Sequence, residues 1–144
     1  PIKHLLKSGH AMISFIKRIG NLQNLALFTT LCIAVVIAAT TLTPGAGKLA
    51  PQGADKLLHT AGFALLVMPM LMVRQKTGLV IAPLALLFGG AIELIQPYVN
   101  RFGDFSDFWA DFVGVLIGVT LAILLNPFIK QYAARNKSAP ESKK

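Results

Sequence analysis

The sequence predicts an all-α fold, an integral membrane bundle of four transmembrane helices with both the N and C termini cytoplasmic. Composition is the first reason: 54% of the 144 residues are hydrophobic and only 14% are charged, whereas soluble domains average about 25% charged residues. The second reason is arrangement, because long stretches carry no charge at all. None of these stretches alternates polar and apolar residues, so a membrane β-barrel is not indicated.

Four segments are long and apolar enough to cross a membrane, which takes about 20 residues of helix. They are residues 22–43, 57–73, 79–95 and 108–129. The last three contain proline or glycine. Both are tolerated in such helices, because neighbouring helices re-satisfy the backbone and small residues allow close approach.

The chain divides into three parts around these spans. Residues 1–21 form a basic N-terminal segment, residues 22–129 the four-helix transmembrane domain, and residues 130–144 a basic cytoplasmic tail. The first segment mixes apolar and basic residues, which fits an amphipathic helix lying at the membrane interface. A disordered basic tail fits equally well, and both interpretations stay open. The polar C-terminal tail is expected to be disordered.

The basic residues predict the orientation, because cytoplasmic loops are enriched in lysine and arginine. Eleven of the 14 lie in the N-terminal segment, in the loop between the second and third spans, or in the C-terminal tail. The other three are Lys48, Lys56 and Arg101. Both termini are therefore expected in the cytoplasm, with the two remaining loops outside. The net charge of +8 then reflects loops and anionic headgroups rather than nucleic-acid binding.

Five of the six acidic residues lie in three short motifs, all at the outward ends of spans. The motifs are D-K-L-L-H at residues 55–59, E-L-I-Q-P at 93–97 and R-F-G-D-F-S-D-F-W-A-D at 101–111. Each ionisable group at membrane depth costs about 2.5–3.5 kcal/mol unless it is paired or faces a water-filled cavity. The three motifs are therefore expected to converge into one polar site.

The first motif offers two interpretations. Asp55 and His59 are four residues apart and share a helix face, as an acid–base or ligand pair would. Alternatively, Asp55 complements the positive end of the helix dipole and His59 bonds to a neighbour. Lys56 either binds a phosphate or extends its ammonium group to the interface.

The second motif contains the acidic residue that is hardest to explain as surface charge. Glu93 lies within the apolar run of its span, and Gln96 shares its helix face three residues later. Glu93 is a candidate acid or base, or the structural partner of Arg101 or Lys56. Gln96 is a candidate substrate-binding residue, or a polar group at the interface.

The third motif places carboxylates at helical spacing. Asp104, Asp107 and Asp111 recur at i, i+3 and i+7, and Gly114 and Gly118 continue the same stripe. The glycines would allow close packing against a neighbouring helix. Carboxylates can bind a divalent cation such as Mg²⁺ or Ca²⁺, or form a charge network with nearby basic residues. Both interpretations, cation binding and a charge network, stay open, and no metal-ligand set is predicted.

In order, spacing and placement, these three motifs resemble those of the VanZ-like membrane family, over residues 55–118. One position departs from the family's pattern: the family usually has asparagine where this chain has Asp111. An amide donates and accepts hydrogen bonds, whereas an ionised carboxylate only accepts. The resemblance implies a small multi-pass protein of the bacterial cytoplasmic (inner) membrane. It also implies a link to the cell envelope and to glycopeptide resistance, since the family is named after a member linked to teicoplanin resistance. It does not bring a settled biochemical activity.

Two classes of function follow. In the first, the outward site binds or processes a lipid-linked or phosphorylated cell-envelope intermediate, and whether it is an enzyme stays open. The candidate catalytic residues are Glu93, His59, Asp107 and Asp111, and the candidate substrate-binding residues are Asp55, Lys56, Gln96, Arg101 and Asp104. In the second, the polar cluster is the assembly core of a structural or accessory subunit. A proton-coupled transporter is a third hypothesis. The expected partners are membrane lipids, an envelope precursor or other membrane subunits.

Overall fold

The computed structural model describes residues 2–45, 54–101 and 103–138. Within these ranges the chain is helical and contains no strand. The elements are α1 (Ile2–Leu42), α2 (Asp55–Val73), α3 (Gln75–Ile95), the short 3-10 helix η2 (Gln96–Val99) and α4 (Phe105–Ser138). Four stretches are long and apolar enough to span a membrane, namely Leu22–Leu42, Asp55–Val73, Gln75–Val99 and Phe105–Gln131. The all-α class with four membrane-spanning helices is therefore confirmed.

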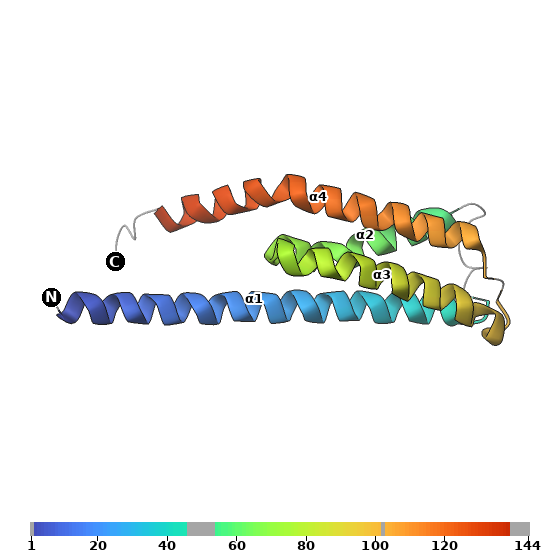
Figure 1. The fold of residues 1–144 in the computed structure, drawn as a ribbon, viewed down its shortest axis with the longest axis horizontal. Helices are drawn as coiled ribbons and strands as arrows, with labels where there is room; N and C mark the ends of the chain where they lie inside the picture. The colour runs from blue at the N-terminus through green and yellow to red at the C-terminus, as the bar shows by residue number, and fades with distance from the viewer. Residues whose placement is uncertain (1, 46–53, 102, 139–144) are drawn as a thin grey trace.

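The four helices form an elongated bundle in which α2 and α3 are much shorter than α1 and α4 (Figure 1). The N-terminal end of α1 and the C-terminal end of α4 lie at the same end of the bundle, where both helices extend beyond the connection between α2 and α3 (Figure 1). The helix ends that carry the three acidic motifs lie at the other end. The cytoplasmic placement of the two chain termini stays a prediction.

Helices α1 and α4 are longer than the predicted spans. Helix α1 runs without a break from Ile2 to Leu42, and α4 continues past Pro127 to Ser138. The residues that follow Pro127 include lysine, glutamine, alanine and arginine, which favour helix. The division of the chain at residues 21 and 130 stays a prediction, and both boundaries fall inside continuous helices. Residues 139–144 of the expected tail lie outside the described ranges.

Helices α2 and α4 make the closest contact in the bundle. A Cβ atom added at Gly114 would collide with the backbone of Thr60, and one at Gly118 would lie 2.5 Å from the Ala64 carbonyl oxygen. The glycine stripe therefore brings the two backbones together, as the sequence predicts. The bundle also has a buried apolar core, whose members include Phe63, Val67, Leu71, Ile92, Val115 and Ala122.

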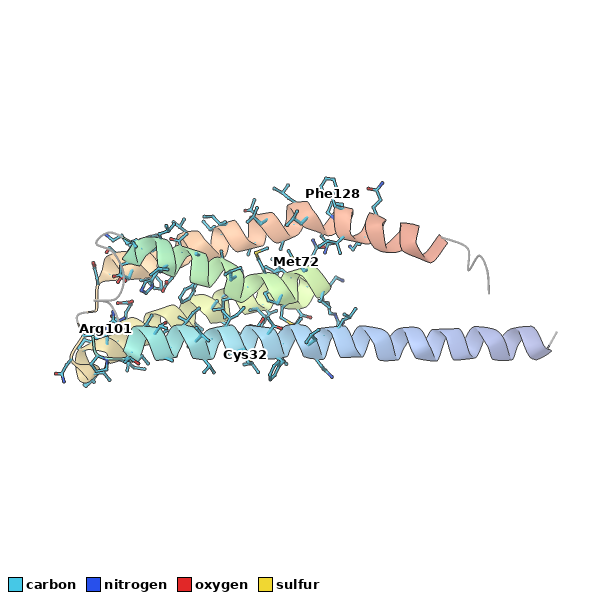
Figure 2. The ribbon with its side chains drawn as sticks, turned by 180° about the vertical axis from the view of Figure 1, so that it is seen from behind. Cys32, Met72, Arg101 and Phe128 are labelled. Atoms are coloured by element: carbon cyan, nitrogen blue, oxygen red, sulfur yellow. The ribbon has the colours of Figure 1, made fainter. Side chains whose placement is uncertain are left out.

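Polar contacts also connect α1 and α4 to α2. The Thr30 hydroxyl donates to the Leu66 carbonyl oxygen at 3.4 Å, and the Asn126 amide donates to the Met72 carbonyl oxygen at 3.3 Å. Large apolar side chains cover the outside of the bundle, and Phe128 points away from it (Figure 2). Such a surface is suited to contact with lipid rather than water.

Candidate functional site

Helices α2 and α4 bring a histidine and an aspartate together at the motif end of the bundle. The Nδ1 atom of His59 lies 2.8 Å from Oδ1 of Asp111, a residue 52 positions later in the chain. The Nε2 atom of the same ring lies 3.9 Å from Oδ2 of Asp107. All three side chains are buried, Asp111 with only 1% of its surface exposed. The imidazole therefore stands between two carboxylates.

The local helix geometry explains this arrangement. Asp107 and Asp111 are four residues apart, so they occupy one face of α4, which also carries Gly114. Because the glycine lets α2 and α4 approach closely, His59 reaches both carboxylates. An ionised carboxylate only accepts hydrogen bonds. Ionised Asp111 would therefore hold the proton on Nδ1 and leave Nε2 facing Asp107.

Helix α3 contributes Glu93 to the same cluster. One ligand atom each from His59, Glu93 and Asp111 can be chosen so that all three lie within 4.8 Å of one another. Glu93 also bridges to the next helix, because its Oε2 atom accepts the backbone N–H of Asp104 at 3.0 Å. Three helices therefore meet at this cluster, which we call the polar site and define as His59, Glu93, Asp107 and Asp111.

Asp104 has a different position from the one the sequence suggested. It precedes α4 rather than lying on its acidic stripe, and it is exposed. Its Oδ1 atom accepts the Ser106 backbone N–H at 2.9 Å, and its carbonyl oxygen accepts the Asp107 N–H at 2.8 Å. These are the contacts of a helix N-cap. Hydrogen bonding from Ser106 lowers the pKa of the Asp104 carboxyl group, because these bonds favour its ionised form.

Arg101 does not pair with the acidic cluster as expected. Its guanidinium group donates to the carbonyl oxygens of Thr40 at 3.0 Å and Thr43 at 3.5 Å, at the C-terminal end of α1. The ion pairs within the described ranges at this end all involve His59, and none involves Arg101 or Lys56. The unused carbonyls at a helix C-terminus attract a cation. The sequence alone could not place that helix end beside Arg101.

The other predicted residues flank the polar site. Asp55 and Lys56 are exposed in the first turn of α2, where a carboxylate complements the helix dipole. Gln96 is buried in η2 and has only 2% of its surface exposed, so it is not a surface group at the interface. The backbone N–H of Arg101 donates to the Gln96 carbonyl oxygen at 3.0 Å. The polar site is thus supported by a folded turn between α3 and α4.

Two features of the site were missed by the sequence analysis. Gly89 packs directly on the Asp111 carboxylate: a Cβ atom added at Gly89 would lie 2.6 Å from Oδ2 of Asp111. The aromatic side chains on the first turns of α4 form a continuous series of ring contacts, through Phe105, Phe108, Trp109 and Phe112. Tryptophan is enriched at the membrane–water interface, and Trp109 of this series lies at the same end of the bundle as the polar site. The spacing of these aromatic residues, three and four positions apart in the sequence, is the pattern that could have revealed the series of ring contacts.

A protein-family model described as VanZ/LLP1 matches residues 2–126, and the chain belongs to this family. The resemblance that the three motifs indicate is confirmed. No curated protein and no solved structure matches the chain.

Proposed function

From this family membership and the geometry of the polar site, we propose that the protein binds or processes a lipid-linked or phosphorylated intermediate of the bacterial cell envelope. The observation that carries the proposal is the buried contact of His59 with Asp111, beside Asp107 and at the end of the bundle where the aromatic series lies. A site at this end of the bundle is within reach of a substrate whose lipid chain stays in the membrane. The site would face outward from the inner membrane.

The bundle does not need these ionisable groups in order to assemble. Gly114 and Gly118 already bring α2 and α4 into backbone contact, and small residues are the usual means of packing membrane helices. Replacing a buried charged pair with apolar residues is often neutral or stabilising. An ionisable cluster that is costly and dispensable for packing supports a role in function.

The arrangement suits proton transfer. A histidine held through Nδ1 by a carboxylate, with Nε2 available, is a common arrangement for a general acid or base. The 3.9 Å between Nε2 and Asp107 Oδ2 exceeds hydrogen-bond length. Nε2 therefore remains available to a substrate group. Lys56, exposed one turn before His59, supplies positive charge at the level where a lipid phosphate would lie.

The second candidate function is that of a structural or accessory subunit. The bond from the Asp104 amide to Glu93 and the contact of His59 with Asp111 connect three helices. A cluster that connects helices can serve assembly alone. The two functions differ in what happens when charge is removed and shape is kept.

The test replaces Asp107 with asparagine and Glu93 with glutamine in the full chain. Purified proteins in nanodiscs would be compared for thermal unfolding and for binding of a polyprenyl phosphate, and cells for tolerance of teicoplanin. Glu141→Gln is the control, because this carboxylate belongs to none of the three motifs. We expect both site variants to keep parental heat stability and to lose ligand binding or tolerance. Unfolding of both would favour the assembly role, and no change in any readout would refute the proposed site.

A further inference from the structure

We infer that His59, Glu93 and Asp111 together hold a divalent cation, and that this cation receives the phosphate oxygen of the ligand. The second half of the inference rests on the proposed function, whereas the first half does not. The three ligands come from three different helices, α2, α3 and α4. A cation here would therefore also join the helices at the motif end of the bundle.

The distances fit a metal site that closes on its ion. In the structure, one ligand atom from each residue lies within 4.8 Å of the other two. Zinc bonds to nitrogen and oxygen are about 2.0–2.2 Å long, which places tetrahedral ligand atoms roughly 3.4 Å apart. Binding would draw the three ligand atoms closer together. Three protein ligands leave the fourth position for water or substrate, as in catalytic zinc sites.

The donor set indicates which cation. One imidazole nitrogen and two carboxylates suit zinc and related transition metals, whereas Mg²⁺ and Ca²⁺ prefer oxygen ligands and retained water. The His59 side chain is more than nine-tenths buried. Its Nε2 atom makes no hydrogen bond to any residue of the described ranges, since Asp107 Oδ2 is 3.9 Å away. A buried ring nitrogen without a close partner is available for coordination.

The charge balance provides a separate reason for a cation. Asp107 and Asp111 are both buried and face a single imidazole, and the Arg101 guanidinium group is bonded to the end of α1. Lys56 is exposed and forms no ion pair within the described ranges. Two buried carboxylates at membrane depth are costly without compensating charge. A divalent cation would supply it.

A small residue lies against the proposed ligand Asp111. A Cβ atom at Gly89 would lie 2.6 Å from Asp111 Oδ2. A larger residue at position 89 would therefore displace this carboxylate from its present place in the ligand set. With the cation bound, His59, Glu93 and Asp111 act as ligands, so the proton-transfer role proposed above for His59 passes to Asp107. A phosphate can then approach an otherwise acidic site, because the cation attracts its oxygen.

Zinc binding to the full chain tests the inference without an activity assay. The protein, reconstituted in nanodiscs and stripped with a chelator, would be titrated with Zn²⁺ by calorimetry, and the bound metal counted by mass spectrometry. We expect one Zn²⁺ per chain, retained in millimolar Mg²⁺. We expect Glu93→Gln and Asp111→Asn to weaken Zn²⁺ binding by about 100-fold. Removing a group that only supports a metal ligand already weakens binding by up to about 100-fold, so loss of a ligand itself should cost at least as much.

Asp104→Asn is the matched control, because Asp104 lies next to the site, its side chain is outside the ligand set, and asparagine also caps helices. It should bind Zn²⁺ like the parent. Absence of saturable binding, or equal binding by the parent and Glu93→Gln, would overturn the inference. The two proposals can be refuted separately. If Asp107→Asn loses polyprenyl-phosphate binding but the parent binds no Zn²⁺, only the cation proposal is refuted. If the parent binds Zn²⁺ but Asp107→Asn binds the lipid unchanged, only the substrate role is refuted.

Discussion

The two ends of the bundle are held together by different chemistry. At the motif end, α2 and α4 meet through His59 and two buried aspartates. At the opposite end, where α2 turns into α3 at Arg74, the contacts found among the described residues are apolar or neutral. There, Gly78 packs on Leu71 so closely that an added Cβ would lie 2.6 Å from it. We call these the site end and the turn end.

The turn end shows what this bundle needs in order to close. A one-residue connection, a glycine contact, apolar packing at Leu71 and one neutral side-chain hydrogen bond from Asn126 to Met72 hold the described residues there. The site end has the same kind of glycine contact at Gly114 and carries buried ionisable groups in addition. Because burial of such groups is unfavourable unless they are compensated, the difference between the ends supports the functional role proposed for them.

The largest expected effect concerns the side of the membrane that each end faces. With Cys32 replaced by alanine, Asn100→Cys at the site end should react with an impermeant maleimide in intact cells. Lys76→Cys at the turn end should react only after permeabilisation. The reason is the excess of basic residues in the loops assigned to the cytoplasm. The reverse pattern would invert the proposed orientation.

Breaking the buried pair should give the largest loss of stability. Asp111→Ala leaves the buried His59 ring without its partner, which typically costs about 3 kcal/mol of unfolding free energy. Asp111→Asn should recover most of this loss, since its amide oxygen still accepts from Nδ1. Thermal unfolding in the same detergent measures both. Equal stability of the two variants would show that the contact is not what stabilises this end.

The close contact between α2 and α4 should tolerate little added volume. Gly114→Ala forces the two backbones apart and should lower the unfolding free energy by about 2 kcal/mol, as overpacking does. Gly62→Ala is the control, because its Cβ would lie 3.6 Å from Ile37, an ordinary contact. Denaturant or thermal unfolding compares them. A Gly114→Ala protein as stable as Gly62→Ala would contradict the contact.

At the turn end the same kind of change should affect stability alone. Gly78→Ala meets the Leu71 backbone and should cost about 1–2 kcal/mol, with ligand and cation binding kept at the site end. Gly90→Ala, whose Cβ would lie 3.7 Å from Phe108, is the control on the same helix. Loss of ligand binding in Gly78→Ala, at unchanged fold, would show that the ends are coupled.

The smallest expected effect concerns the helix cap at the site end. Asp104→Ala should lower the melting temperature slightly, whereas Asp104→Asn should not, since both aspartate and asparagine cap helices. The pKa of Asp104 is lowered in the folded protein. Its contribution is therefore present above the pKa of the unfolded chain and is lost as pH falls through the folded value. Melting curves from neutral to acidic pH should show a smaller acid-induced loss for Asp104→Asn than for the parent.

The sequence predicted the fold class well because the signals are local. Length and apolarity of the spans follow from the solvent they must cross, and the glycine stripe at Gly114 and Gly118 follows from helical spacing. Helix boundaries were less predictable. Proline at 127 and the basic residues after it suggested an end, yet α4 continues to Ser138. Proline constrains the preceding turn without preventing helix beyond it.

The sequence by itself determined that ionisable groups gather at one end of a four-helix membrane bundle, because charge in apolar spans is costly and leaves a visible pattern. Tertiary structure alone decided their partners. It placed His59 on Asp111, Glu93 on the Asp104 amide and the Arg101 guanidinium group at the end of α1. These contacts join residues on different elements, and their geometry depends on how closely the helix backbones approach. The spacing of residues along one helix cannot specify that approach.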